Sequence, residues 1–296
     1  MSYRIIQRRK VWYVFSLLLI GASVVFLALG GFKLGADFNG GTQMQLGFTA
    51  RPPVQEISAF SSSLGYGATT AQSIDASSVL VRMRELTQAE HADILQRMSD
   101  RFPGAQDEAF TIVGPVIGRE LRQRAVVATV LVLLAIIAYV SWAFRKSSRR
   151  LSGWAFGVNA FIALVHDIII TVGFFAFLGY VAHVEIDVLF VTALLTTLGF
   201  SVHDTIVVFD RLREGMQRSS EQHLETMIND SVNTTLVRSI NTSLTTILVL
   251  VALYLFGGAS IRQFVLTLIV GITIGTYSSI FIASPLLLFW DKRKRA

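Results

Sequence analysis

Six long blocks of apolar residues alternate with polar segments along the chain. They cover residues 11–32, 125–144, 151–182, 188–209, 239–261 and 263–290. A membrane-spanning helix needs about 20 such residues. The first block has 22 uncharged residues, longer than the ~7–15-residue core of a signal peptide. We therefore predict six transmembrane helices, the first retained at 11–32 after a short segment 1–10.

Arg and Lys mark one side of the predicted membrane. They gather in the N-terminus, in 145–150, in 210–238 and in the C-terminal tail, whereas the turns at 182–187 and 257–261 contain none. Positive charge favours the cytoplasmic side in short loops, and long translocated domains escape that rule. Both termini and the loop 210–238 are therefore predicted to be cytoplasmic, and residues 33–124 to be extracytoplasmic. Residues 125–296 are predicted to form a five-helix transmembrane domain that includes this loop and the C-terminus.

The segment 33–124 reads as a small α+β domain. Gly41 to Phe48 alternates as a strand, and Pro52-Pro53 opens a helix with apolar residues at helical spacing. Strands are predicted at 69–74, 78–84 and 109–113, and Thr87 with Glu90 forms a capping-box pattern at the start of a second helix. The order βαββαβ predicts a ferredoxin-like extracytoplasmic domain.

Composition agrees with a membrane protein. Of 296 residues, 52% are hydrophobic and 16% charged, against about 25% charged in soluble domains. The net charge of +6 comes from basic residues beside apolar blocks, which favours contact with membrane lipid over binding of nucleic acid. With no cysteine, disulfides and cysteine metal sites are excluded.

The candidates for chemistry are ionisable residues within the apolar blocks or at the entry of the fifth, because each costs about 2.5–3.5 kcal/mol at the centre of a span, together with hydroxyl residues on the same helical faces. The candidate proton pathway comprises Asp204, Arg238, Asp167, His166, His203, Thr197, Ser201 and Thr242. Thr197, Ser201 and Asp204 share a helical face at i, i+4 and i+7. Arg238 keeps its proton and would stabilise the charged form of a nearby carboxylate.

Structural explanations stay open for the same residues. Asp204 and Arg238 could form a static buried ion pair, and His166-Asp167 could satisfy polar groups between helices. His203 lies on a different helical face from Asp204, and the hydroxyls near Thr242 could be interhelical packing.

Enzyme chemistry has little support. The chain has no P-loop, no metal-site spacing around its two His-Asp pairs, and no nucleophile motif. We expect no enzymatic activity and no cofactor.

Four segments resemble the SecF family of protein-export membrane proteins, within the resistance–nodulation–division superfamily. Leu34 to Gly41 is similar to its G-x-D-F-x-G-G motif, with Asp37, Phe38, Gly40 and Gly41 in place. The stretch 199–214, which ends in Asp210, Arg211 and neighbours, resembles the most specific family signature. The stretch 235–243 resembles the Arg-containing start of the fifth span, and Gly114-Pro115 the segment before the second.

The resemblance implies a proton-driven subunit of a bacterial inner-membrane complex. Family members pair with SecD, work beside the SecYEG channel and YajC, and help to draw exported unfolded polypeptide outward. Asp204 and Arg238 match positions linked to proton flow. Two residues depart from the family pattern, which usually has Asn at His203 and Tyr at Phe200.

Two other functions fit the sequence less well. A small-molecule proton antiporter of the same superfamily would have two larger outer domains and about twelve spans in one chain. An intramembrane enzyme would need a nucleophile or a metal site, which the sequence does not offer.

Overall fold

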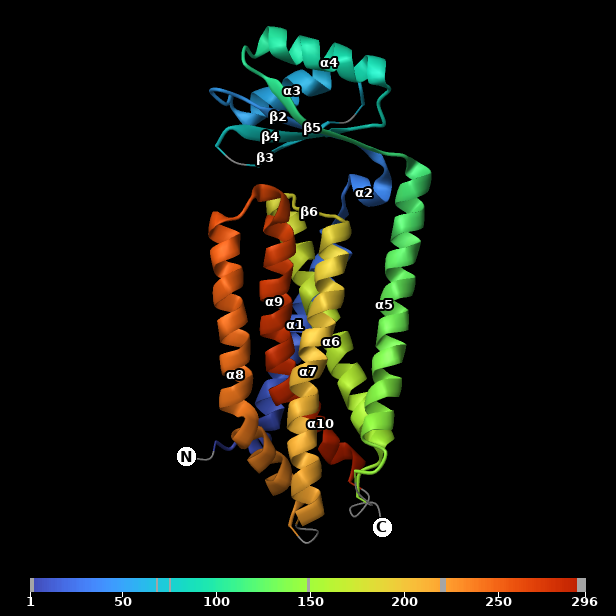
Figure 1. Cartoon of the computed structure of the whole chain (residues 1–296), viewed down its shortest axis with the longest axis vertical. Helices are drawn as coiled ribbons and strands as arrows, with labels where there is room; N and C mark the ends of the chain where they lie inside the picture. The colour runs from blue at the N-terminus through green and yellow to red at the C-terminus, as the bar shows by residue number, and fades with distance from the viewer. Residues whose placement is uncertain (1–2, 68, 75, 148–149, 219–221, 292–296) are drawn as a thin grey trace.

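The computed structural model describes residues 3–67, 69–74, 76–147, 150–218 and 222–291. In this part of the chain, six helices are long and apolar enough to cross a membrane. The basic residues at 149 and 292–295, which the topology prediction uses, lie outside the described residues. Figure 1 shows a helical bundle with a small α+β domain at one end and both chain termini at the other. The predicted fold class is confirmed.

The bundle consists of five long helices and a sixth that changes its winding. The long helices are α1 (Arg9–Ala28), α5 (Pro115–Ala143), α6 (Gly153–Ala182), α7 (Val188–Arg218) and α8 (Leu224–Phe256). The sixth begins as α9 (Arg262–Ser278) and continues through a π-helical turn, η3 (Ser279–Ala283), into α10 (Ser284–Leu286) and η4 (Leu287–Trp290). Short 3-10 turns, η1 (Ile6–Arg8) and η2 (Ala259–Ile261), precede α1 and α9.

Several helix ends differ from the predicted spans. The first helix stops at Ala28 and not at 32, because Gly30 adopts a φ of +71° and ends the helix as a C-terminal cap. The second begins at Pro115, ten residues before the uncharged block, since proline suits the first turn.

The stretch 210–238, predicted as a loop, is mostly helical. It belongs to the end of α7 and the start of α8, and residues 219–221 between them lie outside the described part. Ion pairs one turn apart favour this continuation: Arg211 with Glu214 at 2.9 Å and Arg213 with Asp210 at 2.6 Å. Hydropathy marks the apolar part of a helix and does not mark where the helix ends.

The head domain, residues 41–113, has two layers. Its sheet contains β2 (Gly41–Gly47), β3 (Thr70–Ser73), β4 (Ser78–Met83) and β5 (Gln106–Val113) in the antiparallel order β3-β4-β2-β5. This is the ferredoxin-like arrangement. Helices α3 (Val54–Ser63) and α4 (Gln88–Arg101) cover the face away from the bundle (Figure 1). The core between helices and sheet includes Met44, Leu46, Ile57, Val81, Ile94 and Met98, all fully buried.

Two short elements that the sequence did not predict connect the head to the bundle. The strand β1 (Lys33–Leu34) pairs in parallel with β6 (Glu185–Ile186), which lies between α6 and α7. The single-turn helix α2 (Ala36–Asn39) follows β1 and leads into the sheet. The chain therefore passes the N-terminal end of α7 on its way into the head.

Candidate functional site

Helices α7 and α9 approach closely along a face of small residues. A Cβ atom at Gly275 would lie 2.7 Å from the Cβ of Ser201, and one at Gly271 would collide with Thr197. Thr197, Ser201 and Asp204 are all buried, as their helical spacing predicts. The polar face of α7 is thus packed against the backbone of α9 inside the bundle.

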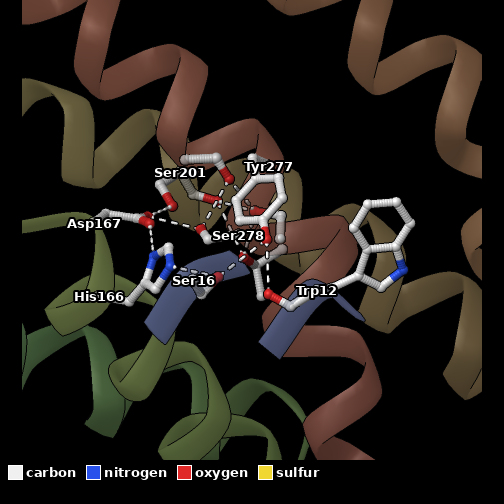
Figure 2. Close-up of polar contacts among 10 residues, drawn as sticks. Trp12, Ser16, His166, Asp167, Ser201, Tyr277 and Ser278 are labelled. Atoms are coloured by element: carbon white, nitrogen blue, oxygen red, sulfur yellow. Dashed lines mark hydrogen bonds and ion pairs between the residues drawn. The ribbon is translucent and has the colours of Figure 1, made fainter. Parts of the chain in front are cut away.

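Asp167 of α6 is the centre of a buried hydrogen-bond network (Figure 2). Its Oδ2 accepts hydrogen bonds from the Oγ of Ser201 at 2.6 Å and of Ser278 at 2.9 Å. Its Oδ1 lies 2.9 Å from Nδ1 of His166. Both residues of the pair are at most 5% exposed. Three helices therefore share one carboxylate.

The network continues from His166 into α1. Nε2 of His166 lies 3.1 Å from Oγ of Ser16, and that Oγ lies 3.0 Å from the phenol oxygen of Tyr277. The Tyr277 hydroxyl donates to the backbone carbonyl of Trp12 at 3.1 Å. Figure 2 shows this line of contacts running from Asp167 to Trp12.

The π-helical turn η3 begins beside the network. The Ser279 hydroxyl donates to the carbonyl of Ser201 at 3.1 Å and lies 2.8 Å from the Thr205 hydroxyl. Turns of this kind interrupt the regular backbone pairing and occur often at functional sites.

Asp204 lies on the same buried face but is less well satisfied. It is 3% exposed, and its Oδ2 has no hydrogen-bond partner within the described residues. Thr276 and Ser239 are its polar neighbours, and His203 and Arg238 are near enough to act electrostatically. A buried carboxylate oxygen without a donor is costly unless it takes up a proton.

Three predicted pathway residues are not buried with this face. His203, Arg238 and Thr242 are exposed on the bundle surface, and the Thr242 hydroxyl donates to the carbonyl of Arg238. Where the chain is described, Arg238 forms no ion pair with Asp204. The static buried ion pair that the sequence left open is therefore absent from the described residues, since Arg238 is exposed whereas Asp204 is buried.

Sequence reasoning missed Ser16, Tyr277 and Ser278. Each is a hydroxyl residue in an apolar block, and the run Thr276 to Ser279 is a signal of the same kind as the hydroxyls of the fifth span. Which hydroxyls meet a carboxylate depends on helix packing and is not visible in one sequence.

The glycine motifs gather where the head joins the bundle. A Cβ at Gly40 would lie 2.8 Å from Cα of Pro115, and one at Gly118 would lie 2.9 Å from the carbonyl oxygen of Phe38. Gly40 and Gly41 have φ of +79° and +135°, which other residues rarely adopt. Together with Gly114, which precedes α5, these residues form a tight joint between the two connections of the head.

Asp37 links this joint to α7. Its Oδ2 accepts a hydrogen bond from the backbone N–H of Val188 at 3.1 Å, and Asp187 accepts one from the N–H of Phe190 at 2.9 Å. Two carboxylates thus satisfy the first turn of α7. Burial raises the pKa of Asp187, and the nearby Asp37 raises it further.

A cavity of about 540 Å³, lined by both polar and apolar residues, lies between the head and the bundle. Arg82 of the sheet crosses to Glu185 at 3.3 Å, and Gln43, Gln45 and Gln72 line the sheet side. The head therefore rests on the bundle through a few polar contacts, while its apolar core lies on the far side of the sheet.

Sequence relatives identify the family. Residues 93–293 match the family described as protein export membrane protein SecD/SecF, C-terminal. A protein translocase subunit SecF from Thermobaculum terrenum is 44% identical over 98% of this chain and 94% of that protein. One from Synechocystis is 38% identical over 96% and 92%. The chain belongs to the SecD/SecF protein-export family.

Solved structures of SecDF are similar to this chain and support the same family. The crystal structure of SecDF from Thermus thermophilus, described as a translocon-associated membrane protein, matches 98% of this chain with a TM-score of 0.87 and 32% identity. SecDF in a super-membrane-facing form matches with a TM-score of 0.72 at the same identity. This chain covers 39% of each of those chains. SecDF relatives therefore occur in more than one arrangement.

Family membership gives this multi-pass membrane protein a role in Sec-pathway translocation. Its SecD/SecF relatives are named as translocase subunits and not as enzymes. Within the described residues, no group of three or more His, Asp or Glu side chains is arranged to hold a metal ion.

Proposed function

We propose that this protein uses the proton gradient of the bacterial inner membrane to assist the export of unfolded polypeptide. It pairs with SecD beside the SecYEG channel, with YajC as a further partner. The observation that carries the proposal is Asp204, a buried carboxylate inside a span with one oxygen that lacks a hydrogen-bond donor in the described structure. Such a group is suited to taking up and releasing a proton.

The neighbours of Asp204 define the path. Ser201 and Thr197 continue its face along α7, and Ser201 connects it to the Asp167–His166 pair of α6. Hydroxyl, carboxyl and imidazole groups in a line can pass protons.

Arg238, His203 and Thr242 serve the same site from the exposed side of the bundle. Arg238 lies at the start of the fifth apolar block, where an arginine facing lipid is costly, so its position favours burial against a partner subunit. This exposed face is therefore the contact surface for SecD. In this arrangement both termini are cytoplasmic and the head domain is outside.

Export into inverted membrane vesicles, with and without a proton gradient, tests the role of Asp204. Asp204→Asn keeps the shape of the side chain and removes its proton exchange, so gradient-stimulated export should be lost while the complex stays assembled. Arg238→Lys keeps the charge and loses the planar guanidinium, and should be clearly impaired. Normal stimulated export by Asp204→Asn would disprove the proposal.

The level of folded complex is measured in parallel. If both variants mainly lower that level, the residues serve assembly, as a static charge pair would. Asp230→Asn, which removes an exposed carboxylate near the start of α8, is the control and should export normally.

A further inference from the structure

The contacts around His166 allow its protons to be counted. The Trp12 carbonyl can only accept, so the single hydroxyl proton of Tyr277 is directed to it at 3.1 Å. In the 3.0 Å contact between Tyr277 and Ser16, Ser16 must then be the donor. Its own proton is used there, and in its contact with His166 it can only accept.

It follows that Nε2 of His166 carries a proton, because it lies 3.1 Å from the Ser16 oxygen. Nδ1 of the same ring lies 2.9 Å from Oδ1 of Asp167. Two unprotonated atoms would repel at that distance, so a second proton lies between them. Whether this proton is bonded to the ring or to the carboxyl, the pair holds two protons and has no net charge.

The second oxygen of Asp167, Oδ2, does not contact His166. It accepts from Ser201 at 2.6 Å and from Ser278 at 2.9 Å. The groups that face the pair are thus Ser16 from α1, Ser201 from α7, and Tyr277 and Ser278 from α9. In the described structure, neither Lys nor Arg forms an ion pair with Asp167, so no fixed positive charge holds it ionised.

We propose that His166 and Asp167 form a proton-binding site, and that its second proton locks α1 onto the bundle through Ser16 and Tyr277. When that proton leaves to water, the remaining one is shared by Nδ1 and the carboxylate, and Nε2 becomes an acceptor. Ser16 then donates to Nε2 and stops donating to Tyr277. The Tyr277 hydroxyl has one proton, so it can donate either to Ser16 or to the Trp12 carbonyl, but not to both. One hydrogen bond between α9 and α1 is therefore lost.

The position of α1 makes this lock relevant to the head domain. The helix α1 leads through β1 and α2 directly into the sheet, so a looser α1 frees one of the two connections of the head. The proton count depends on the hydrogen bonds alone. Its use in export rests on the proposed function.

Nitrogen-15 NMR of histidine-labelled protein tests the site. The full chain is purified with its partner into lipid at neutral pH, and the His166 signals, among five histidines, are assigned with His166→Gln. Nε2 should be protonated in the wild type. In Tyr277→Phe, Ser16 is free to donate to Nε2, so the ratio of protonated to unprotonated Nε2 should fall about fivefold, the factor that corresponds to one net hydrogen bond.

Tyr13→Phe is the matched control. It removes a phenol from the same helix α1 whose hydroxyl is buried without a partner in the described structure, and should leave the His166 signals unchanged. If Tyr277→Phe does not fold, Ser16→Ala removes the acceptor for Nε2 and should shift the signals in the same direction.

Two results would overturn the proposal: an unprotonated Nε2 in the wild type, or a protonated fraction that Tyr277→Phe leaves as it was. The export assay separates this outcome from failure of the proposed function. Normal gradient-stimulated export by Asp204→Asn would disprove the proposed function, but it would not affect the NMR evidence for the proton site.

Discussion

Side-chain hydroxyls make many of the hydrogen bonds inside the bundle. Many bond to the carbonyl one turn earlier in their own helix, as Thr205 does with Ser201. Ser201 and Ser278 also reach between helices to a carboxylate, although the Ser278 hydroxyl lies 3.1 Å from the carbonyl of Gly275 in its own helix as well. Interhelical bonds in membranes contribute about 0.6 kcal/mol on average, so it is the number of bonds around Asp167 that makes its burial tolerable.

At the residue scale, the capping box of α4 predicts an acid-sensitive head domain. A hydrogen bond from Arg84, with two from Thr87, lowers the pKa of Glu90 from 4.5 to about 2. Because the pKa is lower in the folded state, this stabilisation is complete above pH 4.5 and is lost as the pH falls toward 2. The unfolding free energy of residues 35–115, expressed alone, should fall across this window, and Glu90→Gln should flatten the fall.

Glu56→Gln is the control for that measurement. Glu56 lies on α3 and forms no ion pair in the described structure. An equal flattening by both substitutions would show that the Arg84–Glu90 contact is not the cause.

Helix packing decides what the candidate site can do. Pairs of helices approach closely where one helix has a glycine at the contact, as at Gly275 against Ser201 and at Gly173 against Ser23. Small residues let membrane helices approach closely enough for van der Waals contact along their length. The distance between Ser201 and Asp167 therefore depends on residues that have no polar group.

At the element scale, a methyl group at Gly275 should separate α7 from α9. Its Cβ would lie 2.7 Å from that of Ser201, and overpacking of this kind costs about 1–3 kcal/mol. Gly199→Ala is the matched control, since nothing lies within 4 Å of its added Cβ. Unfolding in detergent should show Gly275→Ala destabilised and Gly199→Ala unchanged or slightly stabilised. Equal stabilities would contradict the packing argument.

The head domain is predicted to fold by itself. Its core lies between the sheet and helices α3 and α4, on the side away from the bundle, and includes Val79, Val81 and Phe102. Residues 35–115 should melt cooperatively when monitored by circular dichroism. A disordered spectrum from soluble, monomeric fragment would mean that the bundle is needed for the fold.

For the whole molecule, a prediction about orientation follows from the charge asymmetry. The head and the chain termini lie at opposite ends of the bundle (Figure 1). The absence of native cysteine makes single-cysteine labelling clean. With an outer membrane made permeable, Ala59→Cys should react with a membrane-impermeant thiol reagent in intact cells, and Gln217→Cys should react only after lysis. The reverse labelling pattern would show that the predicted orientation is wrong.

The sequence determined the local features of this protein. Six spans, four strands, two head helices and the Thr87 cap all depend on periodicity or composition within a few residues, and these signals persist in any tertiary arrangement. The inward face of α7 belongs to the same class, because Thr197, Ser201 and Asp204 are related by helical geometry alone. Elements of two to four residues, such as β1, β6 and α2, are too short to show a period.

Only the tertiary structure decided which polar groups meet. Ser16 and His166 are 150 residues apart, and Asp37 and Val188 are 151 apart. Their contacts depend on how whole helices are placed and rotated, for which one sequence allows many combinations. The same rotation turns Arg238 outward and leaves Asp204 inside. The physical reason is that hydropathy fixes the depth of a residue in the membrane, while packing of small residues fixes its direction.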